Sequence, residues 1–191
     1  MKVSVFAASS SKIAPIYIEA ASVLGRLLSE GKHETIYGGG DTGLMGALAD
    51  AVSESGGTIT GVIPEFMVKN GWSHAGVENM LVTEDMNSRK RKIFELADAV
   101  IALPGGVGTL EELTEAITLK QLGLFHGPVV ILNVSGFYDR LLGFMDHLSD
   151  TGFIRADHRN LWTVATTPSE AVEMITGYND NGQEWVKLAR I

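Results

Sequence analysis

Short apolar runs alternate along the chain with longer segments whose apolar residues recur at helical spacing. The apolar runs are rich in β-branched residues and show little polar alternation, which is typical of strands buried on both faces. They predict strands at residues 2–8, 35–37, 58–63, 80–83, 99–103, 128–134 and 161–165. The helical pattern predicts helices at residues 14–30, 44–55, 87–98, 109–122, 137–148 and 168–175.

This regular alternation of strand and helix predicts a doubly wound parallel sheet with helices on both faces, a Rossmann-like α/β fold. Because 191 residues suffice for one well-buried domain, we expect residues 1–191 to form a single nucleotide-binding domain. Residues 65–76 are the least regular part, with a turn expected at residues 70–72. The tail is expected to dock on the body or on a partner subunit through Trp185, Val186, Leu188 and Ile191.

Composition and charge exclude several classes of function. A net charge of −8 and a pI of about 5.1 argue against a general nucleic-acid or anionic-membrane binder. The chain has no cysteine, which excludes disulfides, thiolate metal sites and a catalytic thiol and fits a cytoplasmic location. The five histidines lack metal-binding spacing, so no metal site is expected. The N-terminal apolar stretch is too short for a signal peptide, and no segment approaches the roughly 20 apolar residues that span a bilayer.

In a doubly wound fold, ligands bind beyond the carboxyl ends of the strands. Four stretches lie at or just after such ends, namely residues 9–11, 38–43, 86–90 and 104–112. The last of them is the most informative, because an apolar strand stops at Pro104 and is followed by glycines at 105, 106 and 108 and then by Thr109. A strand, a glycine turn and a helix N-terminus in this order form an anion site, in which Thr109 caps the helix or binds the anion. The alternative is a tight turn whose glycines serve geometry alone.

A basic run at residues 89–92 begins the helix that precedes this turn. Helical spacing places Arg89 and Lys90 on the same side as an apolar stripe, whereas Arg91 and Lys92 point away from it. The stripe consists of Met86, Ile93, Leu96 and Ala97. A cation that faces the interior must be paired, or it costs several kcal/mol. The expected partners are Glu111, Glu112 or a ligand phosphate.

The acidic residues after the glycine turn differ in direction. Thr109, Glu112 and Glu115 share one helix face, and Glu111 lies about 100° away from it. Glu112 is therefore expected to face the same cleft as the Thr109 hydroxyl. A second glycine stretch, residues 38–43, contains G-x-G-x-x-G, and Glu65 lies where a ribose-binding acid would lie in a dinucleotide fold. An NAD-dependent enzyme is therefore an alternative interpretation.

Three stretches match the motifs of the LOG (Lonely Guy) family, often labelled "possible lysine decarboxylase", in order and spacing. They are Gly38-Gly39-Gly40 with Gly43-Leu44-Met45-Gly46, Met86-x-x-Arg89-Lys90, and Pro104-Gly105-Gly106-Val107-Gly108-Thr109-Leu110-Glu111-Glu112. The chain resembles this family over nearly its whole length. The resemblance implies a Rossmann-like homodimer, without metal or cofactor, that hydrolyses the N-glycosidic bond of nucleoside 5′-monophosphates, typically cytokinin riboside monophosphates, to free base and ribose 5-phosphate.

The resemblance also implies roles for individual residues. Arg89 and Glu112 would be catalytic, and the substrate-binding residues would be Ser9, Gly39, Gly40, Met86, Lys90, Gly105, Gly106, Val107, Gly108, Thr109, Leu110, Glu111 and Thr118. The chain departs from plant-type members at Asn87, where they have a histidine, and at residues 71–74, where they have a glutamate. Both departures concern the base side of the site. The rival interpretations are a non-catalytic nucleotide sensor or carrier and a decarboxylase that would need pyridoxal phosphate on a lysine.

Overall fold

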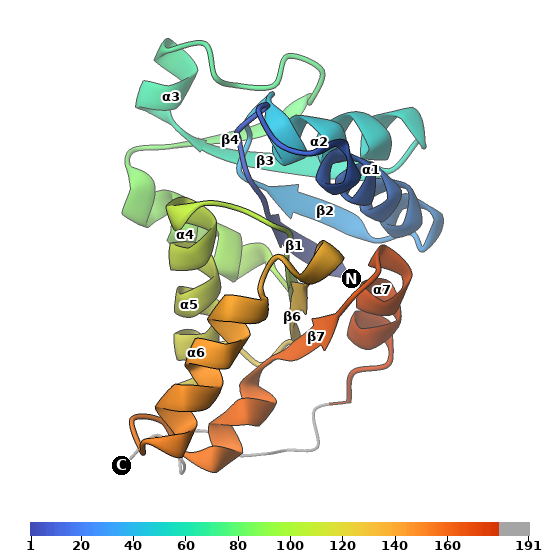
Figure 1. The fold of residues 1–191 in the computed structure, drawn as a ribbon. Helices are drawn as coiled ribbons and strands as arrows, with labels where there is room; N and C mark the ends of the chain where they lie inside the picture. The colour runs from blue at the N-terminus through green and yellow to red at the C-terminus, as the bar shows by residue number, and fades with distance from the viewer. Residues whose placement is uncertain (180–191) are drawn as a thin grey trace.

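A computed structural model describes residues 1–179 and shows one parallel sheet of seven strands (Figure 1). The strand order across the sheet is β4-β3-β2-β1-β5-β6-β7, and every neighbouring pair is parallel. The bounds are β1 (Lys2–Phe6), β2 (Glu34–Tyr37), β3 (Thr58–Pro64), β4 (Asn79–Thr83), β5 (Ala99–Ala102), β6 (Val129–Leu132) and β7 (Thr163–Ala165). The predicted doubly wound fold is confirmed.

The α-helices connect successive strands along most of the chain. Their bounds are α1 (Pro15–Glu30), α2 (Gly43–Glu54), α3 (Glu65–Lys69), α4 (Met86–Leu96), α5 (Val107–Gln121), α6 (Asp139–Asp150) and α7 (Pro168–Thr176). Two short 3-10 helices, η1 (Val134–Gly136) and η2 (Ala156–Leu161), flank α6. None of the helices within residues 1–179 is both long and apolar enough to cross a membrane.

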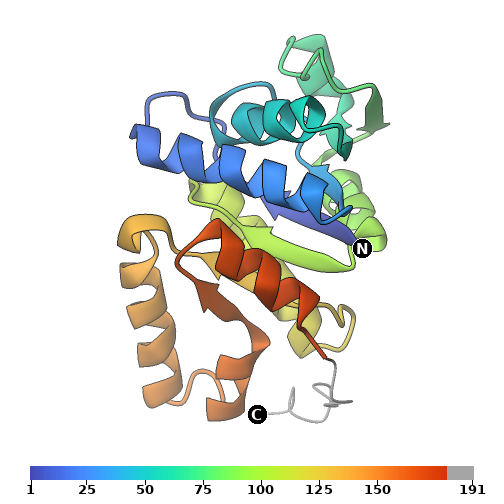
Figure 2. The same ribbon diagram turned by 90° about the vertical axis from the view of Figure 1, so that its right-hand side faces the viewer.

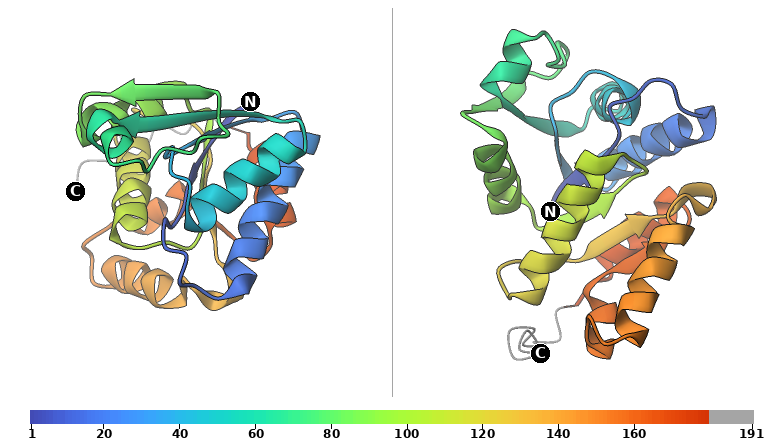
Figure 3. Two further views of the ribbon diagram at one scale, coloured as in Figure 1. Left: turned by 90° about the horizontal axis from the view of Figure 1, so that it is seen from above. Right: turned by 60° about the vertical axis from the view of Figure 1, so that its left-hand side comes forward.

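Helices α1, α2 and α7 cover one face of the sheet, and α4 and α5 cover the other (Figures 2 and 3). Successive strand residues point to opposite faces, so each central strand contributes to both hydrophobic cores. Val5 of β1 packs with Leu24 and Leu48 on the first face. Phe6, the next residue of β1, packs with Ile93 of α4 on the second face. This double burial explains the continuous apolar runs of the strands.

Several segments differ from the prediction. Residues 65–69 form the short helix α3 rather than an irregular stretch, and the expected turn follows it at Gly71, whose φ is +74°. The last strand begins at Thr163 because η2 occupies residues 156–161. Strand β1 ends at Phe6, and beyond it the carbonyl of Ala8 accepts hydrogen bonds from the N–H groups of Leu44 and Met45. The expected docking of the tail lies outside the described residues.

The topology creates one switch point. The chain moves outward from β1 through β2 and β3 to β4, and then returns to place β5 on the other side of β1. The loops after β1 and β5 therefore diverge at the carboxyl edge of the sheet, which is where doubly wound folds bind ligands. The loop after β5 carries the glycine turn that the sequence singles out.

Candidate active site

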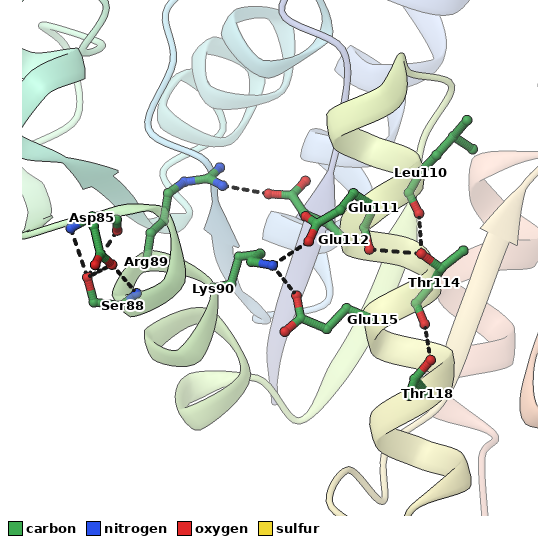
Figure 4. Close-up of polar contacts among 10 residues, drawn as sticks. All are labelled: Asp85, Ser88, Arg89, Lys90, Leu110, Glu111, Glu112, Thr114, Glu115 and Thr118. Atoms are coloured by element: carbon green, nitrogen blue, oxygen red, sulfur yellow. Dashed lines mark hydrogen bonds and ion pairs between the residues drawn. The ribbon is translucent and has the colours of Figure 1, made fainter.

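A buried ion pair joins the two helices on the second face of the sheet. Arg89 of α4 donates from Nη1 to Oε1 of Glu112 of α5 at 2.6 Å (Figure 4). Only 6% of Arg89 and 7% of Glu112 are exposed. Arg89 also donates from Nε to the carbonyl oxygen of Val62 at 3.0 Å, which fixes the plane of its guanidinium. The pair is thus held rigidly at the carboxyl edge of the sheet.

The start of α4 sets the position of Arg89. Asp85 caps the helix by accepting a hydrogen bond from the N–H of Ser88 at 2.7 Å, and the Ser88 hydroxyl in turn accepts from the N–H of Asp85. Because this capping box fixes the first turn, Arg89 and Lys90 follow directly on the inward side. The hydrogen bonds from Ser88 hold the pKa of Asp85 below its ordinary value.

Burial makes Glu112 an unusual carboxyl group. Burial raises the pKa of Glu112 above its ordinary value, and the nearby Arg89 guanidinium opposes this rise without cancelling it. A carboxyl group with a raised pKa takes up and releases a proton closer to neutral pH than an exposed glutamate does. Such a group suits acid–base chemistry at neutral pH.

Lys90 forms a second ion cluster beside this pair. Its ammonium bonds to Glu111 and lies 2.9 Å from Oε2 of Glu115 (Figure 4). The hydrogen bond to Glu111, followed by the one to Glu115, raises the pKa of Lys90. The sequence left the partners of Arg89 and Lys90 open, and the structure assigns each a different glutamate. Glu111 and Glu115, which lie one turn apart on α5, therefore both pair with Lys90.

The rest of the basic run follows the prediction, but one residue of the apolar stripe does not. Arg91 is exposed, and Lys92 pairs with Glu95 on the surface. Ile93 is buried. Met86 is 41% exposed, so its expected place in the buried stripe is wrong. It is the first residue of α4, beyond the part of the helix that packs on the sheet.

The glycine turn after β5 leads into α5 without a side-chain cap. The helix begins at Val107 with Gly106 at its N-cap position, two residues earlier than predicted. Thr109 is consequently not the cap but a buried residue of the first turn, packed so closely over Gly105 that a Cβ there would overlap its side chain. A Cβ at Gly106 or Gly108 would meet no atom of the described residues within 4 Å. Because no side chain caps the start of α5, the first N–H groups of this helix suit an anion.

The second glycine stretch has a different role. The N–H groups of Leu44 and Met45, at the start of α2, donate to the carbonyl oxygen of Ala8 at 2.9 and 3.2 Å. A Cβ on Gly43 would lie 2.5 Å from the carbonyl oxygen of Ser10. The chain itself therefore occupies the helix N-terminus that would bind a dinucleotide pyrophosphate. Glu65, the expected ribose-binding acid, pairs with Lys69 at 2.9 Å. Both observations disfavour the NAD interpretation.

The loop that contains this stretch contributes to the site in another way. Gly38 lies against the guanidinium of Arg89, where a Cβ would overlap Nη2. Gly39 has a φ of +78°, which favours glycine, and a Cβ there would lie 2.8 Å from Cβ of Ile63. Gly40 lies at the rim of a pocket of about 390 Å³. This pocket is lined by Ser9, Gly40, Asp41, Thr42, Met45, Met67 and Trp72.

The structure brings to this edge of the sheet some residues that sequence reasoning did not single out. Met67 and Trp72 come from the segment expected to be irregular. The one sequence signal there is a large aromatic residue in a polar turn. Tyr138 is buried, and its hydroxyl donates to the carbonyl oxygen of Leu103, just before the glycine turn, at 2.7 Å. Thr118 lies lower on α5, beside a groove between α5 and α6, and its hydroxyl bonds to the carbonyl oxygen of Thr114. The structure therefore does not bring Thr118 to the ion pair.

Comparison with known proteins connects this geometry to a family. The sequence model described as "Possible lysine decarboxylase" matches residues 45–175. The chain is 41% identical over 196 residues to the cytokinin riboside 5′-monophosphate phosphoribohydrolase LOG7 of Arabidopsis thaliana, covering 100% of this chain and 90% of the relative. It is 40% identical over 185 residues to the probable cytokinin riboside 5′-monophosphate phosphoribohydrolase LOGL2 of Oryza sativa subsp. japonica, covering 97% and 76%.

Solved structures support the fold. The molybdenum cofactor binding protein of Rippkaea orientalis superposes with a TM-score of 0.68 at 22% identity, over 92% of this chain and 94% of that one. The molybdenum cofactor carrier protein of Chlamydomonas reinhardtii gives a TM-score of 0.68 at 21% identity, over 93% and 98%. At this level of identity the likeness concerns the fold alone.

Proposed function

The chain belongs to the LOG family, described as possible lysine decarboxylases, and from this membership we propose that it hydrolyses the N-glycosidic bond of a nucleoside 5′-monophosphate. The products are the free base and ribose 5-phosphate. Relatives about 40% identical over nearly the whole chain are named for this reaction on cytokinin riboside 5′-monophosphates. Purine and cytokinin nucleotides are therefore the proposed substrates.

The observation that carries this proposal is the buried Arg89–Glu112 pair next to an uncapped helix N-terminus. The phosphate would rest on the backbone N–H groups of residues 105–109, where Gly106 and Gly108 leave room for its oxygens. The positive end of the α5 dipole favours the negative charge of the phosphate. Lys90, which pairs with Glu111 and Glu115 of the same helix, would supply a cation to the phosphate.

The chemistry assigned to the ion pair follows from the nature of the reaction. Cleavage breaks the bond between C1′ of the ribose and a nitrogen of the base, and the bonding electrons leave with the base. Positive charge builds up on the ribose ring, and the Glu112 carboxylate would stabilise it or take a proton from the attacking water. The water oxygen bonds to C1′, and a proton reaches the departing base. Arg89 would orient Glu112 or polarise the base.

The test is incubation with AMP and with N6-isoprenyladenosine monophosphate, followed by chromatography that separates free base from ribose 5-phosphate. Glu112→Gln should lower kcat by about 10²–10⁴-fold, the usual contribution of an acid–base group, while AMP still binds. The matched control is Glu95→Gln, which removes a surface carboxylate of α4 and should leave turnover unchanged. Binding without release of base from the wild-type protein would instead support the sensor or carrier interpretation.

Three further properties belong to the same proposal. We propose a cytoplasmic enzyme that acts without nucleic acid, as the absence of cysteine and the net charge of −8 suggest. We also propose a homodimer, which the family resemblance implies. The exposed Phe144 and the apolar groove between α5 and α6 support this oligomeric state. Light scattering after size-exclusion chromatography measures it directly.

A further inference from the structure

We propose that Asn133, the first residue after β6, is a positioning residue that holds the glycine turn in place through Tyr138. Asn133 lies outside the three family motifs and outside the set of expected substrate-binding residues. The inference rests on the proposed function in one respect, because it takes residues 105–109 to receive the phosphate. It goes further by naming the residues that fix this turn from the neighbouring strand.

Asn133 is a polar side chain buried at the end of an apolar strand. All four residues of β6 are buried hydrophobic residues, and Asn133 follows them with only 8% of its surface exposed. A buried amide costs free energy unless it is hydrogen-bonded. Its Oδ1 accepts from the N–H of Tyr138 at 2.7 Å, and its Nδ2 donates to Oδ1 of Asp139 at 2.7 Å. One partner donates and the other accepts, so an amide satisfies both and a leucine of similar size satisfies neither.

These two hydrogen bonds close a tight turn between β6 and α6. The N–H of Asn133 donates to the carbonyl oxygen of Ala165 of β7 at 2.7 Å, which anchors the start of the turn. Within the turn, Ser135 has a φ of +52° and Gly136 a φ of +73°, both in the left-handed region. This region is unfavourable for serine, so the turn depends on contacts that hold it. The Asn133 side chain provides such contacts, because it binds the residues at the exit of the turn.

Tyr138 connects this turn to the glycine turn. Strands β5 and β6 are parallel neighbours, with Ala102 opposite Ile131, so the loops that follow them leave the sheet side by side. Tyr138 is 1% exposed, and its hydroxyl donates to the carbonyl oxygen of Leu103 at 2.7 Å. The glycine turn begins two residues after Leu103. Two hydrogen bonds of 2.7 Å therefore link Asn133 to the backbone that enters the glycine turn.

The other side of the same backbone is held by β1 and its loop. The N–H of Leu103 donates to the carbonyl oxygen of Phe6 at 2.9 Å, and the N–H of Ala8 donates to that of Pro104 at 3.3 Å. The Tyr138 hydroxyl adds a hydrogen bond from the side of β6. The turn that follows is rich in glycine, which is conformationally permissive. The directions of its N–H groups therefore depend on how the backbone is held where it enters the turn.

The alternative role of Asn133 is structural, in that it would stabilise the connection between β6 and α6 and do nothing else. Both roles predict a lower Tm for a variant without the amide, so stability does not distinguish them. Only the positioning role predicts weaker binding of phosphate ligands. It also predicts that this loss disappears when the Tyr138 hydroxyl is already absent, because the two residues act in series.

The test is a double-mutant cycle on affinity. Ribose 5-phosphate and adenosine, which lacks the phosphate, are titrated calorimetrically into the wild type, Asn133→Leu, Tyr138→Phe and the double variant. Each single variant should bind ribose 5-phosphate about 2- to 12-fold more weakly, the net contribution of one hydrogen bond, and the double variant no more weakly than Asn133→Leu. Adenosine should bind all four proteins equally.

The matched control is Thr60→Val, in the amino-terminal half of β3. Thr60 is 2% exposed, and its hydroxyl bonds to Glu34 and Asn79. Its removal should lower Tm and leave both affinities unchanged. If Asn133→Leu does not fold, Asn133→Ala removes the same two hydrogen bonds without adding a bulky apolar group, and its cycle is interpreted in the same way.

Four results overturn the proposal. They are an unchanged affinity for ribose 5-phosphate in a folded Asn133 variant, additive losses in the double variant, equal weakening by Thr60→Val, and a wild type that binds adenosine but not ribose 5-phosphate. AMP turnover is measured separately. A wild type that binds AMP without releasing base refutes the hydrolase proposal, and the cycle still tests the positioning role. Hydrolysis of AMP with wild-type KM by both single variants supports the hydrolase and overturns the positioning role.

Discussion

Removing either partner of the buried ion pair should destabilise the protein, and the two losses should depend on pH in opposite directions. Arg89→Ala leaves the Glu112 carboxyl buried without its cation and also removes the hydrogen bond to Val62. Breaking a buried pair in this way costs about 3–5 kcal/mol. For a chain of this length, that loss lowers Tm by roughly 6–20 °C. The surface control Glu95→Gln should cost no more than about 1 kcal/mol.

The sign of the pH dependence follows from the raised pKa of Glu112. Its folded-state pKa exceeds the ordinary value of 4.5, so the native state holds the proton more tightly than the unfolded chain does. Stability is then lost as pH rises through the folded pKa. Without Arg89 that pKa rises further, since the guanidinium lowers it, and the deficit of Arg89→Ala grows with pH. Glu112→Gln lacks the titrating group altogether, so its deficit shrinks as the wild type loses stability.

Denaturant unfolding at pH 5 and pH 8, at one protein concentration, measures both deficits. Each unit of pKa difference corresponds to about 1.4 kcal/mol, which linear extrapolation resolves. The double variant Arg89→Met with Glu112→Met should be more stable than either single variant at pH 8, because no buried charge is left unpaired. Parallel pH curves for the two single variants would refute the electrostatic reasoning, because the pair would then contribute only packing.

Four other substitutions address the proposed phosphate site. Gly105→Ala should destabilise the protein because its Cβ overlaps the packed side chain of Thr109, whereas Gly108→Ala should stabilise it by up to about 1 kcal/mol. Both variants should raise the KM for AMP. Thermal unfolding measures the change in stability, and steady-state kinetics measures the change in KM. Tyr138→Phe should cost about 1 kcal/mol of stability and lower kcat/KM, because its hydroxyl fixes Leu103 at the base of the turn; an unchanged kcat/KM would show that this bond does not position the turn. Lys90→Met should weaken AMP about 10- to 100-fold and reduce the salt dependence of binding, and titration at two ionic strengths tests both.

The sequence predicted the features of the fold that local pattern determines. Both faces of each central strand are buried, so the strands read as continuous apolar runs, and the helices between them carry the 3.6-residue period. The inward direction of Arg89 follows from helical spacing alone, and the structure confirms it. The identity of its partner does not follow, because Glu111 and Glu112 are one residue apart and only the packing of α4 against α5 decides between them.

The features that the sequence did not predict depend on contacts between distant segments. Met67 and Trp72 line a pocket because Ser73 pairs with Gly40, thirty-three residues earlier in the chain. Thr109 is not the cap of α5, because the helix starts at Val107, two residues earlier. The glycines around this start made several helix starts equally compatible with the sequence pattern. Met86 is exposed because the helical period predicts which side of the helix a residue faces, but not how deeply that residue is buried.

The two glycine turns explain why one motif was misleading. Both follow a strand and precede a helix, but among the described residues they differ in whether another loop accepts hydrogen bonds from the first N–H groups of the helix. At α2 the carbonyl of Ala8 accepts the first N–H groups, because the loop after β1 crosses over this helix terminus. At α5 no side chain caps the helix, and Gly106 and Gly108 have no neighbours among the described residues that would require glycine. The glycines near α2 thus allow close packing between loops, as Gly105 does under Thr109, whereas Gly106 and Gly108 leave space beside the start of α5. Neighbouring segments, not the motif itself, determine which turn leaves its N–H groups available to the proposed phosphate.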